Sequence, residues 1–322
     1  MSASSPLDLL RDATDVTLLA HVRPDADALG SALALGRALH QRGATVRVSF
    51  AIPGETPESL RGLDAGNLVV PADQVPERAG LVVCLDTPTP ARLGLLADRL
   101  AGAGAVLVID HHASNTHYGT HNLVDVTAEA TAVLVLRVLD ELGVELDEPI
   151  ARCLYAGLVT DTRGFRRATP STHHAAARLL EAGVDPDKLV REVMDDRPFT
   201  WLPMLAKVLS TARLEPEQAQ GFGLVHAVVT LEAAADVRLE EVEGVVDVLR
   251  TTREAEVAAV LKQQAVDEWT VSLRAVGKID VSVAARSLGG GGHRLAAGCT
   301  VTGTAEEGLA AVRAALAQAP LL

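Results

Sequence analysis

Aromatic side chains and cysteines are scarce in this sequence, and both shortages limit what the chain can be. Aromatic residues make up 2% of the 322 residues whereas hydrophobic residues make up 48%, so the cores must be built from Val, Leu and Ala. The three cysteines, Cys84, Cys153 and Cys299, lie far apart and form no C-x-x-C pair. This spacing is typical of reduced thiols in a cytoplasmic protein.

Long apolar segments and an excess of positive charge are also missing. No uncharged apolar stretch reaches the length of a membrane span, and residues 1–6 lack the basic and apolar regions of a signal peptide. We therefore expect a cytoplasmic protein with no membrane partner. The net charge of -13 argues against a protein that coats long duplex nucleic acid. An anionic substrate would need metal ions or a local Arg/Lys cluster to reverse the field at its site.

The sequence pattern predicts an α/β protein of two domains. Over the first half, short apolar runs alternate with helix-like segments, which indicates βα units on a parallel sheet and a first domain over residues 1–185. Residues 186–213 carry few strand signals and are expected to form a helical linker. Residues 214–322 are expected to form a smaller, mixed α/β domain. Its predicted elements are extended segments at 222–230, 256–262, 269–275 and 278–283 and a helix at 305–319.

Helix signals in the first half lie between the predicted strands. A helix over 27–42 is expected to stop at Gly43, and a strand is expected over 45–51. Thr127 is the expected N-cap of a helix over 128–142. The apolar segment 151–160 favours a helix over a strand, and another helix follows Pro170 and ends at Gly183.

Side chains that can bind metal follow three apolar runs. Ligands of open parallel sheets bind at the carboxyl ends of the strands, so these side chains should converge. One histidine at a strand end usually closes a turn, but three such ends together indicate a metal site. Run 16–20 is followed by His21, Asp25 and Asp27, run 81–85 by Asp86, and run 105–109 by Asp110, His111 and His112.

The candidate ligands divide into two metal sites. Asp25 and Asp27 are separated by one residue and diverge in direction, which suits two ions, and the isolated Asp86 is placed to bridge them. His111 adds a second imidazole and Asp161 a further carboxylate. One predicted site holds His21, Asp25 and Asp86, and the other holds Asp27, Asp86, His111 and Asp161. Imidazole and carboxylate ligands without thiolate favour Mn²⁺, with Mg²⁺, Co²⁺ or Fe²⁺ as less favoured alternatives.

This ligand set predicts phosphoryl chemistry. Two divalent ions about 3.5–4 Å apart clamp a phosphoryl group and make hydroxide available near neutral pH. Asp110 is placed to accept an imidazole N–H and fix the orientation of that ring. His112 is then left for the substrate, either as a phosphate ligand or as the acid that protonates the leaving oxygen.

Candidate substrate-binding residues lie near the metal motifs and in the second domain. The run Gly289-Gly290-Gly291-Gly292-His293 permits backbone N–H groups to point into an anion nest, with His293 at its rim; the alternative is a flexible loop. Arg274, on a predicted strand, and Arg286, before the glycines, are either substrate ligands or ordinary surface charges. Asn115 either orients a phosphate or caps a turn.

Together these motifs resemble those of the DHH phosphoesterase superfamily. The similarity rests on His21-x-x-Pro24-Asp25-x-Asp27-Ala28-x-Gly30-Ser31, Asp86, Asp110-His111-His112 and Thr160-Asp161-Thr162, in the family's order. The glycine run with Ala296-Ala297-Gly298 resembles the DHH-associated domain. The resemblance covers almost the whole chain and is greatest to the nanoRNase branch. It implies two Mn²⁺ ions, an active site in the interdomain cleft, a homodimer, and hydrolysis of short oligoribonucleotides and 3′-phosphoadenosine 5′-phosphate (pAp).

One departure and several rival functions stay open. Arg163 stands where the branch usually has glycine, which adds bulk and charge beside the metals. Within the same chemistry, the rivals are a phosphodiesterase for cyclic dinucleotides or their linear products, and an inorganic pyrophosphatase or exopolyphosphatase. The glycine-histidine run argues against the pyrophosphatase. A nucleotide sensor without turnover conflicts with the intact ligand set, and a nicotinamide-linked oxidoreductase lacks the G-x-G-x-x-G turn.

Overall fold

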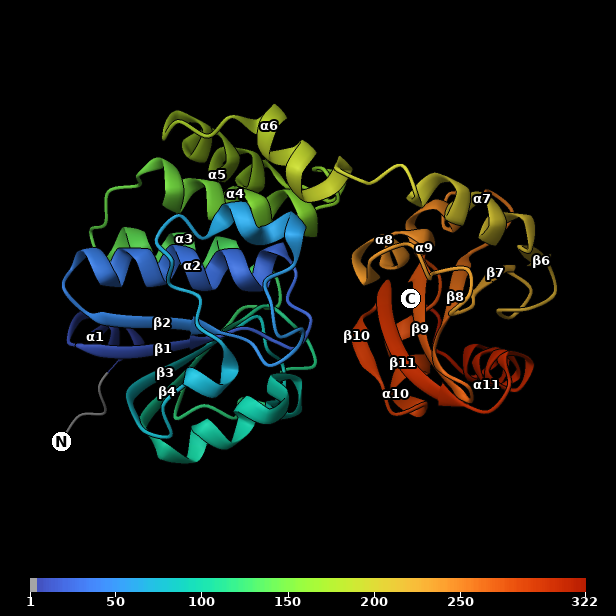
Figure 1. Ribbon diagram of the computed structural model, residues 1–322, viewed down its shortest axis with the longest axis horizontal. Helices are drawn as coiled ribbons and strands as arrows, with labels where there is room; N and C mark the ends of the chain where they lie inside the picture. Colours follow the sequence, from blue (N-terminus) through green and yellow to red (C-terminus); the bar gives the residue numbers. More distant parts are fainter. Residues whose placement is uncertain (1–4) are drawn as a thin grey trace. The chain divides into compact units, whose positions relative to one another are not determined.

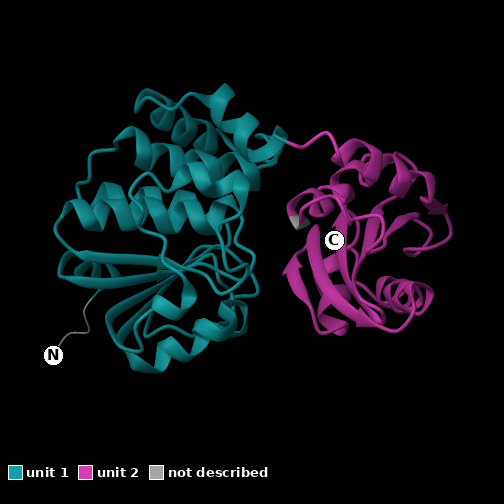
Figure 2. Ribbon diagram, in the orientation of Figure 1, with its two compact units in different colours: residues 1–196 teal, residues 197–322 magenta. Residues whose placement is uncertain are grey.

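The computed structural model describes residues 5–322, apart from the side chain of Leu239. Residues 1–4 lie outside this range; they belong to the segment 1–6, which was expected not to be a signal peptide. The chain divides into two compact units, residues 1–196 and 197–322 (Figure 2). The predicted domain limits, the linker over 186–213 and the cleft between the domains stay predictions. Within the described range, no helix combines the length and apolar character needed to cross a bilayer.

The first unit contains the predicted parallel sheet. Its five strands, in the order β2-β1-β3-β4-β5, all run parallel. Leu18 and Val83 on one face, and Cys84 and Val108 on the other, are fully buried because helices or loops cover both faces of the sheet. The strands are β1 (Asp15–Leu19), β2 (Thr45–Ser49), β3 (Ala79–Leu85), β4 (Ala103–Asp110) and β5 (His121–Val124).

Helices cover both faces of this sheet, with α2, α3 and α4 together on one face in Figure 1. The α-helices are α1 (Pro6–Arg11), α2 (Ala26–Gln41), α3 (Thr131–Glu141), α4 (Glu148–Asp161), α5 (Pro170–Glu181) and α6 (Pro186–Val190). Three 3-10 helices are η1 (Glu58–Leu63), η2 (Ala72–Gln74) and η3 (Pro90–Gly102), and η4 (Arg191–Asp195) is a π-helical turn. The prediction of a helix over 151–160 is confirmed by α4. Helix α2 packs closely on α4 at Gly30, where a Cβ atom would lie 2.4 Å from the carbonyl oxygen of Cys153.

The second unit is built on a mixed six-stranded sheet, in the order β10-β11-β9-β8-β7-β6. Two separate apolar clusters lie against this sheet. One contains Leu261 and Leu273 together with Leu309 of a C-terminal helix, and the other contains Val260 together with Val246. The strands are β6 (Arg213–Glu215), β7 (Leu224–Val229), β8 (Val257–Ala265), β9 (Glu268–Ala275), β10 (Gly291–His293) and β11 (Ala296–Thr302). The helices are α7 (Trp201–Ser210), α8 (Leu239–Glu243), α9 (Val245–Leu249), α10 (Val281–Ser287) and α11 (Ala305–Ala317).

Two sequence predictions of local structure are wrong. The segment 278–283 does not form a strand, because the Asp280 carboxylate accepts the N–H groups of Ser282 and Val283 and starts α10 there. Thr127 does not cap a helix; its hydroxyl donates to Asp125 at 2.6 Å. Helix α3 begins four residues later, where a carboxylate from another helix receives its first N–H groups.

Candidate metal centre

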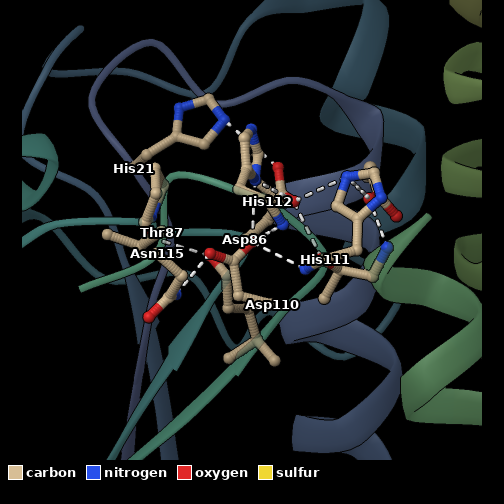
Figure 3. A network of polar contacts seen from close by, with 12 residues as sticks. His21, Asp86, Thr87, Asp110, His111, His112 and Asn115 are labelled. Atoms are coloured by element: carbon tan, nitrogen blue, oxygen red, sulfur yellow. Dashed lines mark hydrogen bonds and ion pairs between the residues drawn. The ribbon is translucent and has the colours of Figure 1, made fainter. Parts of the chain in front are cut away.

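The candidate ligands gather where the strand order of the first sheet reverses. From β1 the chain moves to β2 on one side, and later to β3 on the other. Such a switch point opens a crevice at the carboxyl ends of the central strands. His21 lies two residues past β1, Asp86 directly follows β3, and Asp110 is the last residue of β4. Figure 3 shows these residues together with His111 and His112.

Asp86 stands at the centre of this group. Its φ of 54° is in the left-handed region, which aspartate tolerates better than most residues, and it is 3% exposed. One carboxylate oxygen, Oδ2, lies 3.6 Å from Nε2 of His21. The other, Oδ1, lies 3.5 Å from Nε2 of His111 and 3.5 Å from Nδ1 of His112. A single side chain therefore offers one oxygen to each of two clusters (Figure 3).

The first cluster contains His21, Asp25 and Asp86, whose ligand atoms lie within 4.8 Å of one another. Asp25 also caps α2, because its Oδ1 accepts the N–H of Ala28 at 2.9 Å. Its Oδ2 is left to face His21 Nε2 at 3.7 Å. The Asp25 side chain is 55% exposed while those of the other two are buried, so this cluster has a side open to solvent.

The second cluster contains Asp27, Asp86 and His111, again with ligand atoms within 4.8 Å of one another. Asp161, at the end of α4, joins it through Oδ2, which lies 3.2 Å from His111 Nε2. Asp27 Oδ2 lies 4.0 Å from the same nitrogen. The structure therefore assembles both ligand groups that the sequence predicts, with Asp86 shared between them.

Contacts on the far side of each imidazole leave Nε2 facing the carboxylates. His111 Nδ1 lies 3.1 Å from the carbonyl oxygen of Ala128. A carbonyl only accepts, so Nδ1 carries the proton in this contact and the Nε2 lone pair faces the cluster, as in metal-ligating histidines. His21 Nδ1 lies 2.9 Å from the carbonyl of Val22, and Arg92 Nη2 lies 3.1 Å from the same nitrogen.

The pKa values report an excess of negative charge in the second cluster. Burial, together with the charges of Asp86 and Asp161, raises the pKa of Asp27 well above its usual value. Burial and the charges of Asp25 and Asp86 raise the pKa of Asp161 in the same way. A divalent cation would supply the missing positive charge. These clusters of carboxylate oxygens and imidazole nitrogens therefore suit divalent metal ions.

The pKa of His21 predicts how metal binding depends on pH. Burial opposes the charged imidazole, but the nearby carboxylates of Asp25 and Asp86 outweigh this effect and raise the pKa to about 10. In the metal-free protein, the stability that the imidazolium contributes below pH 6.5 is lost as the pH rises toward 10. A cation must displace this proton to reach Nε2. We therefore expect Mn²⁺ affinity to rise about tenfold per pH unit between about pH 6.5 and 8.5.

Calorimetric titration in two buffers of different ionisation enthalpy measures both the affinity and the number of protons released. His174→Gln, at an exposed position on α5, is the control and should keep the wild-type pH dependence. Affinity that is constant across this range, with no proton released on binding, would contradict the assignment of His21 as a ligand.

Asp110 uses its two oxygens for different partners. Oδ1 lies 2.7 Å from His112 Nδ1 and accepts the backbone N–H of His111 at 2.8 Å. Asp110 is therefore in contact with an imidazole, as expected from the sequence, and the ring is that of His112; its role in catalysis stays a prediction. Oδ2 accepts the side-chain amide of Asn115 at 2.5 Å. Asn115 also caps the local turn, because its Oδ1 accepts the N–H of His117 at 2.7 Å, and its binding of substrate stays a prediction.

The two predicted arginines of the second unit lie on different elements. Arg274, on β9, has its Nε 3.9 Å from Oδ1 of Asp247. Arg286, in the last turn of α10, donates to the Ser282 hydroxyl at 3.1 Å. Both therefore contact other side chains of their own unit, and their role in substrate binding stays a prediction.

The glycine run forms a helix end and a strand. The N–H of Gly290 donates to the carbonyl of Ala285 at 2.8 Å and closes α10, so the expectation that this N–H joins an anion nest is wrong. Gly291, Gly292 and His293 form β10 and pair with β11. Gly289 and Gly290 therefore form the turn after α10, and only the last three residues of the run belong to a strand. Substrate binding by Gly290, Gly291, Gly292 and His293 stays a prediction.

Arg163 occupies a backbone position that favours glycine. Its φ is 53°, and those of Gly164 and Phe165 are 66° and 63°, so three consecutive residues adopt the left-handed conformation. An arginine at the first of these positions has a steric cost that glycine would avoid. Its positive charge partly offsets the raised pKa of Asp161.

Two residues that support the ligands were not predicted from the sequence. The Thr131 hydroxyl donates to Asp86 Oδ1 at 2.8 Å. Gly157, inside α4, lies so near Asp27 that a Cβ atom would be 2.6 Å from Asp27 Oδ1. The sequence did carry a signal for each: Thr131 is a polar residue at the start of an apolar helix, and Gly157 is a glycine in a helix interior.

Family models match both units. The model of the DHH family, N-terminal domain, matches residues 15–158, and that of the DHHA1 domain matches residues 223–319. The bifunctional oligoribonuclease and PAP phosphatase of Thermus thermophilus is 34% identical over 89% of this chain and 84% of its own length. The cyclic-di-AMP phosphodiesterase of Listeria monocytogenes is 29% identical over 89% of this chain and 44% of its own.

A solved structure supports the same assignment. An exopolyphosphatase-related protein from Bacteroides fragilis superposes with a TM-score of 0.85 at 25% identity, covering 95% of this chain and 93% of that one. The shared fold, the matching models for both units and the Thermus relative agree with the resemblance carried by the motifs. The chain belongs to the DHH phosphoesterases that carry a DHHA1 domain, and it is a hydrolase of that family.

Proposed function

We propose that this protein is a manganese-dependent phosphoesterase that hydrolyses short oligoribonucleotides and pAp with two metal ions. The observation that carries the proposal is the arrangement of Asp86, which directs one oxygen to each of two histidine-aspartate clusters. Carboxylate bridging of this kind is a feature of two-metal hydrolases. The substrate class is supported by the Thermus relative, which is named for both activities.

The ligands would divide as the clusters do. His21, Asp25 and Asp86 would hold one ion, and Asp27, Asp86, His111 and Asp161 the other. When bound, the ions supply positive charge to a phosphoryl oxygen and make a coordinated water more acidic. The exposed side of Asp25 is where substrate and water would enter.

Asp110 and His112 would take part in proton transfer to the leaving oxygen. The contact between Asp110 Oδ1 and His112 Nδ1 holds the imidazole in one orientation and tautomer, with Nε2 turned away from Asp110. From that position, His112 would bind a phosphate oxygen or protonate the leaving oxygen. Asn115 fixes the other oxygen of Asp110, so it would support this orientation indirectly.

The second unit would bind the remainder of the nucleotide. A chain of net charge -13 needs local positive charge to hold a polyanion, and Arg274 and Arg286 would supply it, with His293 as a hydrogen-bond donor. Gly291 has no atom within 4 Å of the position of a Cβ, so the strand β10 leaves room for a ligand there. Contacts confined to these few residues would suit a few nucleotides and not a long duplex.

A second candidate function is hydrolysis of cyclic dinucleotides or of their linear products. The observation that favours it is the Listeria relative, a cyclic-di-AMP phosphodiesterase that shares 29% identity over 89% of this chain. This chain matches less than half of that protein's length, so the likeness concerns the phosphoesterase part alone.

A panel of substrates distinguishes between the two candidate functions. We expect the Mn²⁺-loaded protein to release product from dinucleotides and pAp at least about tenfold faster, in kcat/KM, than from cyclic di-AMP or pyrophosphate. The same metal ions would act on every phosphoester, so contacts with the nucleotide decide the selectivity, and pyrophosphate has no nucleoside to make them. Bound metal is measured on the same preparation, and Asp86→Asn controls for contaminating nucleases. Preference for cyclic di-AMP would establish the second candidate. Metal binding without product release would support a sensor.

A further inference from the structure

Thr131 contacts two of the acidic candidate ligands at once. It is the first residue of α3 and is fully buried. Its hydroxyl donates to Asp86 Oδ1 at 2.8 Å, and its backbone N–H donates to Asp27 Oδ2 at 2.7 Å. These two carboxylates come from the end of β3 and from the first turn of α2. One residue therefore links the shared ligand to a ligand of the second cluster.

The start of α3 holds Thr131 in this place. The first N–H groups of a helix have no partner within the helix, and Ala130, at the N-cap, offers no side-chain acceptor. The carboxylate of Asp27 replaces it, because Oδ2 accepts from Thr131 and Oδ1 accepts the N–H of Ala132 at 2.8 Å. The backbone of Thr131 is therefore anchored, and only rotation about the Cα–Cβ bond is left to place its hydroxyl.

The hydroxyl distinguishes the two oxygens of Asp86. Oδ1, which accepts from Thr131, is also the oxygen 3.5 Å from His111 Nε2, whereas Oδ2 faces His21. Rotation of the carboxylate about its Cβ–Cγ bond would exchange the two oxygens. A hydrogen bond to Oδ1 opposes that rotation and occupies one of its lone pairs, which leaves the other for the second cluster.

We infer that Thr131 is a positioning residue of the two-metal centre, whose hydroxyl fixes the bridging orientation of Asp86 and thereby the affinity of the second metal site. The inference rests on the proposed function in that it takes the two clusters to be metal sites. It does not depend on which phosphoester is hydrolysed. Threonine fulfils the role because its hydroxyl, and not its methyl group, contacts the carboxylate.

The test compares Thr131→Val with Thr131→Ser. Valine keeps the shape of threonine but removes the donor, whereas serine keeps the donor and removes the methyl group. We expect valine to weaken binding of one Mn²⁺ ion by about 10–100-fold, the effect typical of outer-shell partners, and serine to stay within about threefold of wild type. Titration of the metal-free proteins, followed by electron paramagnetic resonance of free Mn²⁺, gives the stoichiometry and affinities without substrate.

Thr17→Val is the matched control. Thr17 is also buried in the first unit, and its hydroxyl has no hydrogen-bond partner among the described residues, so its loss should not change metal binding. Thermal melting of each metal-free variant separates a folding defect from a binding defect, and serine tests the inference should valine fail to fold.

Wild-type Mn²⁺ affinity in Thr131→Val, or an equal loss in Thr131→Ser, would overturn the inference while leaving the proposed function intact. Conversely, a wild-type protein that binds two ions but hydrolyses no nucleotide would refute the function, and the binding data would still decide the role of Thr131. Absence of Mn²⁺ binding by the wild type would overturn both.

Discussion

Replacing Asp86 with asparagine is expected to lower phosphoester hydrolysis by about a thousandfold. The reason is that one carboxylate serves both clusters, so its loss weakens both ions together. Removing roughly 4 kcal/mol of metal-dependent stabilisation from the transition state corresponds to that factor. Asparagine is the appropriate substitution because, like aspartate, it tolerates the φ of 54° at this position. The measurement is kcat with a dinucleotide at saturating Mn²⁺, together with the number of ions bound.

Asp140→Asn serves as the comparison. Asp140 pairs with Arg178 on the surface of the same unit, so loss of its charge should leave kcat and metal content unchanged. If the Asp86 variant retained more than a few per cent of wild-type activity with both ions bound, Asp86 would not be the bridging ligand.

Gly157→Ala is expected to lose both stability and activity, opposite to the usual effect of this change in a helix. Alanine normally stabilises a helix interior by up to about 1 kcal/mol over glycine. Here its Cβ would lie 2.6 Å from Asp27 Oδ1 and 3.0 Å from Asp27 Cα, so α4 and α2 must separate. We expect a loss of about 2 kcal/mol in the free energy of unfolding, as for overpacked cores, and about a hundredfold loss in kcat from displacement of Asp27.

Urea unfolding and steady-state kinetics on the same preparation measure the two losses. Gly54→Ala is the matched substitution, since a Cβ there meets nothing within 4 Å and the backbone does not need a positive φ. It should be neutral or slightly stabilising. An increase in stability for Gly157→Ala would show that the contact between α4 and Asp27 is looser than the structure indicates.

The strand ends were predictable from the sequence because they follow from a short physical argument. An apolar run that ends in His or Asp indicates a buried strand with its polar end at the sheet edge, and parallel strands present those ends together. His21, Asp86 and Asp110 lie where this argument puts them. Asp161 was also anticipated, at the end of the apolar segment that forms α4.

Errors arose where partners distant in the sequence decide local structure. Thr127 is of a residue type that favours the N-cap, but α3 starts at Thr131. The first N–H groups of this helix donate to Asp27, more than one hundred residues earlier in the chain. No local pattern reveals such a cap. The same limit applies to Gly157, whose purpose becomes visible only when α2 and α4 are packed.

How polar groups are used was only partly predictable from the sequence. Asn115 was given two alternatives, a phosphate ligand or a turn cap, and the N–H of Gly290 was expected in an anion nest. In the structure, Asn115 supports Asp110, and Gly290 closes α10. Backbone and amide groups in folded proteins are nearly all hydrogen-bonded within the fold, and which ones are left for a ligand depends on the tertiary structure.

The distribution of the ligands along the chain has a consequence for biosynthesis. His21, Asp86, His111 and Asp161 are spread from the first strand to the fourth helix, so a ribosome must release nearly the whole first unit before the set is complete. The nascent polypeptide must close these long loops without help from the ions, because a partial set binds them weakly. A divalent metal ion would therefore stabilise only the complete first unit, and shorter fragments would gain little stability from it.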